Sequence, residues 1–155
     1  MSPSKTDPAP RPIEAETRER FAHLLALPTR WMDNDTYGHI NNVVYYALFD
    51  TIINRYLIEE GGLDIAAGPV IGLVVETKCQ FKRPVGFPDV VEMGLRVARV
   101  GTSSVSYECG VFAAGRPELC AFGHVVHVFV DRGSRRPTPI PARLRAALER
   151  LLSVR

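Results

Sequence analysis

The polar residues that precede an apolar helical segment have the types and order that chemistry on a carbonyl group requires. Two carboxylates, a glycine, a histidine and two carboxamides follow one another in a short stretch: Asp33, Asp35, Gly38, His39, Asn41 and Asn42. The first N–H groups of a helix have no partner within the helix and can bind a developing oxyanion. A carboxylate beside such a helix start can act as a nucleophile or as a general base.

Hydrophobic periodicity predicts the elements on either side of this polar stretch. We expect a strand over residues 21–31, in which Pro28 marks an edge or a bend. Over residues 42–60 the apolar side chains cover most of a helical surface and leave a narrow polar stripe, which indicates a buried helix. The glycine pair at residues 61–62 then ends that helix.

After residue 68 the apolar residues recur with a period of two, which predicts four strands. Three of them alternate apolar and polar residues, whereas the last, residues 119–130, is apolar on both faces and is therefore expected to be central. Four consecutive strands with tight turns favour an antiparallel meander. With a short helix expected over residues 143–152, the fold class is α+β, a curved antiparallel sheet wrapped around one long central helix.

Length and composition limit the classes of protein to which the chain can belong. With 155 residues, 46% of them hydrophobic and 23% charged, the chain is expected to form one globular domain over residues 21–155. Residues 1–20 contain four prolines and few apolar residues, and we expect them to form a flexible tail, with helical structure near residues 14–20 as an alternative for its second part. The net charge of +2 argues against a broad nucleic-acid-binding surface.

Cysteine usage and the N-terminal sequence indicate the compartment. Three cysteines without short paired spacing fit neither a disulfide framework nor a zinc motif. The sequence has no apolar signal core and no stretch long enough to span a membrane, so we expect a cytoplasmic protein without membrane contact. Asp33, Asp35 and His39 alone are a weak metal-site pattern, and we expect neither a metal nor another cofactor.

One long motif runs through the polar stretch, Arg30-Trp31-x-Asp33-x-Asp35-x-x-Gly38-His39-x-Asn41-Asn42-x-x-Tyr45. Two shorter motifs follow it, Phe81-x-x-Pro84-Val85 with Val91, and Val100-Gly101-Thr102-Ser103-Ser104-Val105. In these motifs, their order and their spacing, the chain resembles the hotdog-fold acyl-CoA thioesterases of the 4-hydroxybenzoyl-CoA thioesterase-like branch. The resemblance covers roughly residues 24–130.

The resemblance implies a hotdog fold, a homodimer or homotetramer whose sheets extend side by side, and acyl-CoA bound at the subunit interface. It also implies an enzyme that hydrolyses an acyl-CoA to the free acid and CoA, with Asp35 as the catalytic carboxylate. After Gly38 the chain has His39-Ile40-Asn41-Asn42, where the best-studied aromatic-specific member has more apolar and aromatic residues. This difference leaves the acyl specificity open.

We predict a catalytic set of Asp35, His39 and Asn42. Asp35 either attacks the thioester to form a mixed anhydride or deprotonates a water molecule. His39 either polarises the thioester and positions water or makes a structural hydrogen bond. Asp33 is expected to order the loop, through Arg30 or a backbone N–H, and to take no part in the chemistry.

The start of the predicted helix supplies the oxyanion hole in this scheme. Either Asn41 or Asn42 is the N-cap. The backbone N–H groups around Asn41, Asn42 and Val43 are the candidate oxyanion donors. Gly38 lets the backbone adopt unusual dihedral angles and lie close to the thioester.

The predicted substrate-binding residues are Gly38, Val43, Tyr45, Lys82, Arg83, Ser103 and Ser104. Tyr45 is expected in the core or in a pocket wall. Lys82 and Arg83 either bind the CoA phosphates or are ordinary solvated charges. Ser103 and Ser104 either hydrogen-bond the thioester or the pantetheine arm, or are simply turn residues.

Two other functions compete with thioester hydrolysis. One is a hotdog hydratase or dehydratase, which needs a base at the β-carbon of the acyl group, but the motif resembles the thioesterase branch. The other is a non-catalytic module that binds acyl-CoA or an acyl carrier. A sensor of that kind usually adds a DNA-binding segment, and the N-terminal tail is too short and too balanced in charge for one.

Overall fold

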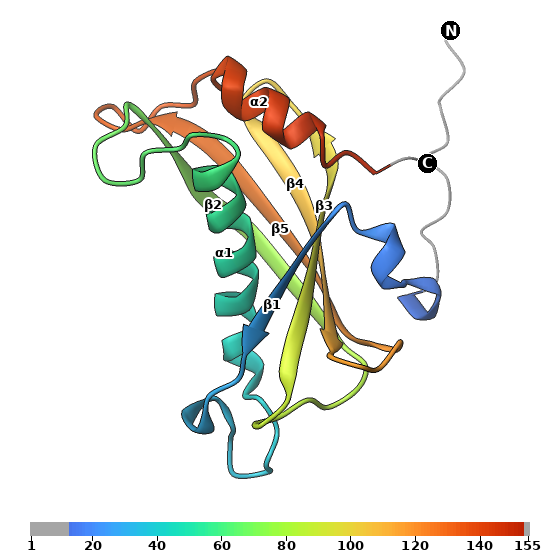
Figure 1. Cartoon of the computed structure of the whole chain (residues 1–155). Helices are drawn as coiled ribbons and strands as arrows, with labels where there is room; N and C mark the ends of the chain where they lie inside the picture. The colour runs from blue at the N-terminus through green and yellow to red at the C-terminus, as the bar shows by residue number, and fades with distance from the viewer. Residues whose placement is uncertain (1–12, 154–155) are drawn as a thin grey trace, which may run out of the picture.

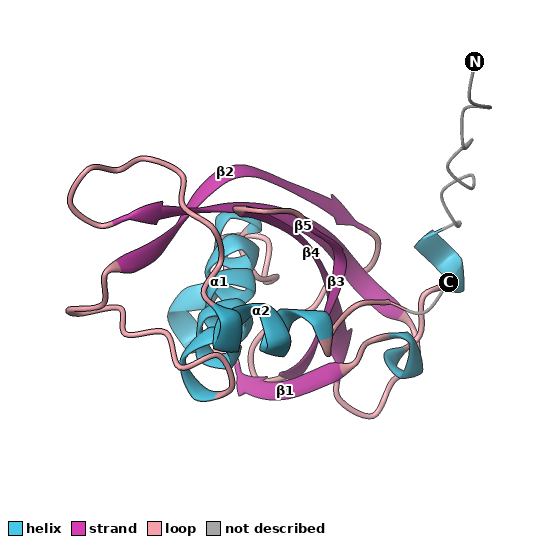
Figure 2. Ribbon diagram, turned by 90° about the horizontal axis from the view of Figure 1, so that it is seen from above, coloured by secondary structure: helices cyan, strands magenta, loops and turns pink. Residues whose placement is uncertain are grey.

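A curved antiparallel sheet of five strands wraps around one long helix in the computed structural model, which describes residues 13–153 (Figures 1 and 2). The strands are β1 (His23–Pro28), β2 (Val70–Phe81), β3 (Val90–Val100), β4 (Ser104–Ala113) and β5 (Leu119–Asp131). The α-helices are α1 (Asn42–Glu59) and α2 (Ala142–Glu149), and the 3-10 turns are η1 (Ile13–Ala15), η2 (Arg18–Arg20) and η3 (Trp31–Asp33). This is the predicted hotdog arrangement. Within the described residues, no helix is both long and apolar enough to cross a membrane.

The sheet order is β1-β3-β4-β5-β2, and every neighbouring pair is antiparallel. β3, β4 and β5 form a meander, and β5 is an interior strand, as its two apolar faces indicated. The predicted meander of four strands is wrong for β2, which pairs with β5 and not with β3. β1 already occupies the outer edge of β3, with His23 opposite Leu95 and Pro28 opposite Val90. The chain therefore crosses from one edge of the sheet towards the other between β2 and β3.

The helix α1 begins at the predicted residue and lies on the concave face of the sheet (Figure 2). A Cβ atom at Gly123 of β5 would lie 2.4 Å from the ring of Phe49, so glycine is needed for this close approach. Val43 and Ile58, which lie outside the face that contacts the sheet, are exposed. The predicted burial of the helix on nearly all sides is therefore not observed in one protomer. The buried face consists of Tyr45, Phe49, Ile52, Ile53, Tyr56 and Leu57.

The N-terminal segment covers part of the opposite, convex face. Residues 13–20, which the sequence analysis assigned to the flexible tail, contain Glu16, whose carboxylate forms an ion pair with Arg96 of β3 at 2.7 Å. The guanidinium of Arg96 also lies 4.7 Å from the ring centre of Phe21. Both partners of the ion pair are buried. Residues 1–12, the rest of the predicted tail, lie outside the described residues.

A buried histidine lies in the core beneath α1. His127 of β5 is fully enclosed, and its Nδ1 atom lies 3.2 Å from the hydroxyl of Tyr107. Burial lowers the pKa of His127 to about 4. His124 points to the other face of the same strand, in agreement with the sequence analysis. The core thus contains one imidazole that folding keeps neutral.

His127 is expected to make the protein less stable at mildly acidic pH. Below the usual histidine pKa of about 6.5 the unfolded chain binds a proton that the folded chain does not, so stability falls as the pH drops from about 6.5 towards 4. Between pH 7 and pH 5 this amounts to about 2 kcal/mol. Urea unfolding at both pH values, at one protein concentration, measures it.

His127→Phe is expected to remove most of this difference between the two pH values. Val125→Ala, a cavity-forming change at a buried neighbour on the same strand, serves as the control. It is expected to lower the free energy of unfolding by a similar amount at both pH values. An undiminished pH dependence in His127→Phe would contradict the assignment.

Candidate active site

Asp33 determines the geometry of the loop that precedes α1. Its Oδ2 atom accepts the backbone N–H of Arg30 at 2.8 Å, and its Oδ1 atom accepts two guanidinium N–H groups of Arg30 at 2.8 and 3.0 Å. Its carbonyl oxygen accepts the N–H of Asn41 at 2.9 Å. Burial by itself would raise the pKa of the Asp33 carboxyl, but the hydrogen bonds from Arg30 outweigh it, and the net pKa lies below its usual value. Asp33 therefore makes the predicted loop-ordering contact with Arg30.

Asp35 lies in a tight turn that directs its carboxylate. The N–H of Gly38 donates to the carbonyl of Asp35 at 3.1 Å, and the N–H of Asp35 donates to the carbonyl of His39 at 2.9 Å. One carboxylate oxygen, Oδ1, accepts the N–H of Tyr37 at 2.8 Å. Gly38 has a φ angle of +83°, which glycine adopts without strain. Within residues 13–153 the second oxygen, Oδ2, has no hydrogen-bond partner, so it is available to a ligand.

The connection between β2 and β3, residues 82–89, packs against this loop. The N–H of Ile40 donates to the carbonyl of Val85 at 2.8 Å. The N–H of Phe87 donates to the carboxamide oxygen of Asn34 at 3.0 Å. These two hydrogen bonds join segments far apart in the sequence and bring the end of β2 beside the turn that contains Asp35.

The first N–H groups of α1 are not all available. Asn41 is the N-cap: its carboxamide oxygen accepts the N–H of Val43 at 3.1 Å, and its carbonyl accepts the N–H of Val44 at 2.9 Å. The N–H of Asn41 itself is bonded to Asp33. Of the three predicted oxyanion donors, the N–H of Asn42 alone has no acceptor within the described residues. The sequence left the N-cap open between Asn41 and Asn42. Because Asn41 is the cap, the backbone N–H of Asn42 is the one left without an acceptor among the described residues.

A hollow of about 430 Å³ lies beside these groups, and we refer to it as the Asp35 hollow. Tyr45 and Phe81 form one wall, with their ring centres 5.1 Å apart in an edge-to-face contact. Burial raises the pKa of Tyr45 to about 12, so its hydroxyl stays protonated at neutral pH and the residue serves as a wall. The complete lining is Asp35, Tyr37, His39, Ile40, Asn42, Tyr45, Phe81, Lys82, Arg83 and Pro84.

The structure brings together all three predicted catalytic residues and three of the predicted substrate-binding residues, Tyr45, Lys82 and Arg83. Gly38 belongs to the adjoining turn and Val43 is exposed on α1, and neither lines the hollow. His39 lines the hollow with its ring exposed, and that ring makes no hydrogen bond within residues 13–153, so the predicted structural hydrogen bond is not observed.

Ser103 and Ser104 lie at the other end of the sheet. The carbonyl of Ser103 accepts the N–H of Phe129 at 2.7 Å, and Ser104 pairs with Val128. The length of β3 separates this turn from the Asp35 loop by about 30 Å (Figure 1). Within one protomer, these two serines therefore lie too far from Asp35 to contact a thioester bound there.

Four lining residues were not predicted as site residues: Tyr37, Ile40, Phe81 and Pro84. Phe81 and Pro84 did occur in a motif of the resemblance. An aromatic residue at the end of a predicted strand, three positions before a proline, is a signal that could have identified Phe81 as a site residue from the sequence. Among residues 13–153, no group of three or more histidine, cysteine, aspartate or glutamate side chains is arranged to hold a metal ion.

Comparison with protein families matches residues 29–148 to the thioesterase-like superfamily. Comparison with curated proteins finds no match. The solved PA5185 protein of Pseudomonas aeruginosa strain PAO1 is 58% identical, with 88% of this chain and 96% of that chain covered and a TM-score of 0.87. A candidate thioesterase of the same species, PA2801, is 30% identical over 82% of this chain and 98% of its own, with a TM-score of 0.77. A Thermus thermophilus thioesterase complexed with coenzyme A and Zn is 28% identical. The match covers 86% of this chain and 96% of that chain, with a TM-score of 0.72.

Removal of the N-cap side chain is expected to destabilise the helix start. Asn41→Ala leaves the N–H of Val43 without its acceptor and should lower the free energy of unfolding by about 1 kcal/mol. Asn42→Ala is the matched control, because the exposed Asn42 side chain makes no hydrogen bond within the described residues. It should cost less than about 0.5 kcal/mol. Equal losses in urea unfolding would contradict the cap assignment.

Proposed function

The chain belongs to the thioesterase-like superfamily, and from that membership we propose that it hydrolyses an acyl-CoA thioester to a free acid and CoA. One observation carries the proposal. The Asp35 carboxylate, with one oxygen unpartnered among the described residues, lines the same hollow as Asn42, whose backbone N–H is the unpartnered donor at the start of α1. A nucleophile or base and an oxyanion donor are the two groups that acyl transfer requires.

In the proposed reaction the thioester carbonyl oxygen accepts a hydrogen bond from the N–H of Asn42. Asp35, or a water molecule that Asp35 deprotonates, attacks the carbonyl carbon and moves the carbonyl electron pair onto that oxygen. The tetrahedral intermediate then re-forms its carbonyl, breaks the C–S bond and releases the CoA thiolate, which takes up the proton that Asp35 accepted in the general-base route or a proton from water in the nucleophilic route. In the nucleophilic route, water hydrolyses the mixed anhydride and regenerates Asp35. His39, which lines the same hollow, positions the water or polarises the thioester.

The basic residues at the end of β2 are proposed to bind the CoA moiety. Lys82 and Arg83 line the hollow directly after Phe81, and two adjacent cations suit phosphate groups. The Thermus thermophilus relative that was crystallised with coenzyme A supports CoA as the carrier. A non-catalytic acyl-CoA-binding module is the competing function, because binding alone would use the same cations.

The working form is proposed to be a homodimer, or a homotetramer of two such dimers, in which the β2 edges of two copies pair. Among the described strands β2 has one neighbour, β5, so its other edge is unpaired over twelve residues. Val74 and Val75 on this edge strand are 49% and 59% exposed. A long, apolar, unpaired strand favours pairing with a second chain. Pairing there would also bring a second chain beside the exposed side of α1.

Asp35→Asn is expected to abolish thioester hydrolysis while leaving the fold intact. Loss of the carboxylate removes the nucleophile or base and should lower kcat by about 10²–10⁴-fold. Release of free thiol from a panel of acyl-CoAs, from acetyl-CoA to palmitoyl-CoA, measures the effect. Glu118→Gln, an exposed carboxylate in the β4–β5 turn, is the matched control and should retain native turnover.

Two results would overturn this assignment. Full activity in Asp35→Asn would exclude Asp35 as the reacting group. Thiol release by neither protein, together with binding of the CoA esters by both, would replace the enzyme with the binding module.

Val75→Arg is expected to prevent β2 pairing and to yield monomers with little activity. A charge on the strand edge opposes the approach of a second copy by desolvation and by repulsion across the two-fold axis. Leu24→Arg places the same charge on the opposite edge strand, β1, where the side chain is similarly exposed, and should leave the dimer intact. Light scattering at several protein concentrations distinguishes the two. A dimeric Val75→Arg protein would contradict pairing through β2.

A further inference from the structure

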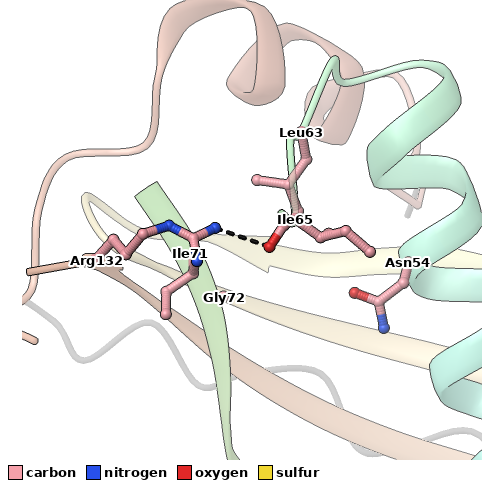
Figure 3. Close-up of a pocket in the computed structure, with 6 residues that line it drawn as sticks. All are labelled: Asn54, Leu63, Ile65, Ile71, Gly72 and Arg132. Atoms are coloured by element: carbon pink, nitrogen blue, oxygen red, sulfur yellow. Dashed lines mark hydrogen bonds between the residues drawn. The ribbon is translucent and has the colours of Figure 1, made fainter. Parts of the chain in front are cut away.

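The strand β2 is fastened to a loop of α1 at each of its ends, and the two fastenings hold different segments. At the start of β2 lies a second hollow of about 230 Å³, lined by Asn54, Leu63, Ile65, Ile71, Gly72 and Arg132 (Figure 3). There the guanidinium of Arg132 donates to the carbonyl of Ile65 at 2.8 Å and so holds the loop that follows α1 (Figure 3). At the end of β2, the connection to β3 meets the loop that precedes α1. This second fastening reaches the turn that contains Asp35.

Asn34 joins the Asp35 turn to the connection between β2 and β3. Its backbone pairs with Ile40 in an antiparallel bridge, which closes the turn between them. Its carboxamide oxygen accepts the N–H of Phe87 at 3.0 Å. The ring centre of Phe87 also lies 5.9 Å from that of Trp31, in an edge-to-face contact. Asn34 does not line the Asp35 hollow, so its side chain holds the loop and does not face a ligand.

The connection lies directly against the turn. A Cβ atom at Gly86 would lie 2.7 Å from the carbonyl oxygen of Gly38 and 3.4 Å from the Cα atom of His39. Glycine at position 86 therefore permits a close approach of two backbones. A movement of the connection would displace the turn that carries both Asp35 and His39.

The connection itself is fixed to the sheet. The N–H groups of Lys82 and Arg83 both donate to the carbonyl of Cys120 in β5, at 2.8 and 3.0 Å. At the other end of the connection, the hydroxyl of Thr29, the residue that follows β1, donates to the carbonyl of Asp89. The sheet thus holds the connection at both ends, and the connection provides a fixed support for the exposed turn.

We propose that Asn34 is a positioning residue: through Phe87 it holds the Asp35 turn on the sheet, and so directs the Asp35 carboxylate at the thioester carbon or at the attacking water. This rests on the proposed thioesterase function. Reacting atoms must lie about 3–3.5 Å apart, and a misplacement of about 1 Å can lower turnover about 10²-fold. Asp33 orders the loop internally through Arg30, whereas Asn34 fixes the position of the loop on the sheet.

Asn34→Ala is expected to lower kcat about 10- to 100-fold for the acyl-CoA that the native protein hydrolyses fastest, and to leave KM within about twofold of native. The walls of the hollow and its cations stay in place, so substrate binding is retained. Asn54→Ala is the matched control, because the Asn54 carboxamide donates to the carbonyl of Asp50 within its own helix at 2.8 Å. It should leave kcat and KM at their native values. A rise in KM with an unchanged kcat in Asn34→Ala would overturn the proposal.

Hydrogen exchange at the Phe87 amide tests the same contact without substrate. Asn34→Ala removes the acceptor of this N–H and should raise its exchange rate about tenfold. Asn34→Asp keeps an acceptor oxygen at the same position, and should retain the protection and, at the pH of maximal turnover, most of the native kcat. Gly86→Ala pushes the connection away from the Gly38 carbonyl and should lower kcat as Asn34→Ala does.

The outcomes separate this inference from the proposed function. Native kcat in Asn34→Ala, together with faster exchange of the Phe87 amide, would overturn the positioning role and leave the thioesterase function intact. Equal losses of kcat in Asn34→Ala and Asn34→Asp, with the amide protected only in the second, would also overturn the positioning role. No thiol release by the native protein, or undiminished activity in Asp35→Asn, would overturn the thioesterase function and the positioning role with it.

Discussion

One long helix, α1, covers most of the concave face of a five-stranded sheet, with the short helix α2 packed beside it, and much of the molecule follows from how α1 does so. A helix with its side chains is about 10 Å wide, whereas five strands spaced about 4.8 Å apart span nearly twice that width. The contact of Phe49 with Gly123 brings the helix close to β5. The strip of concave surface next to β2 is left without a cover of its own. The exposed valines of β2 and the exposed side of α1 border that strip.

The same placement of α1 determines where chemistry is possible. A helix start is a cluster of unpaired N–H groups, and the loop from Arg30 to Asn41 uses most of them. Asp33 orders the loop, and its carbonyl oxygen accepts the N–H of Asn41. The side-chain oxygen of Asn41 in turn accepts the N–H of Val43. The donor that remains, at Asn42, borders the hollow that contains Asp35. Structural hydrogen bonding and candidate catalysis are thus divided between adjacent residues.

The connections at the two ends of α1 differ in polarity. At the N-terminal end, the polar Asp35 loop packs against the end of β2 through Ile40 and Val85. At the C-terminal end, an apolar loop fastened by Arg132 packs against the start of β2. One strand therefore borders a hollow at each of its ends.

The sequence by itself determined the local features: the start and end of α1, the period-two strands, and the motif that contains Asp33, Asp35 and Asn41. These depend on residues close in the chain, through helical periodicity, capping and glycine stops. Tertiary structure alone decided that β2 pairs with β5, that Asn41 is the cap, and that Ser103 lies far from Asp35. The reason is physical: strand edges and asparagine caps have equivalent alternatives nearby in sequence, and only the competition for partners in the folded chain selects among them.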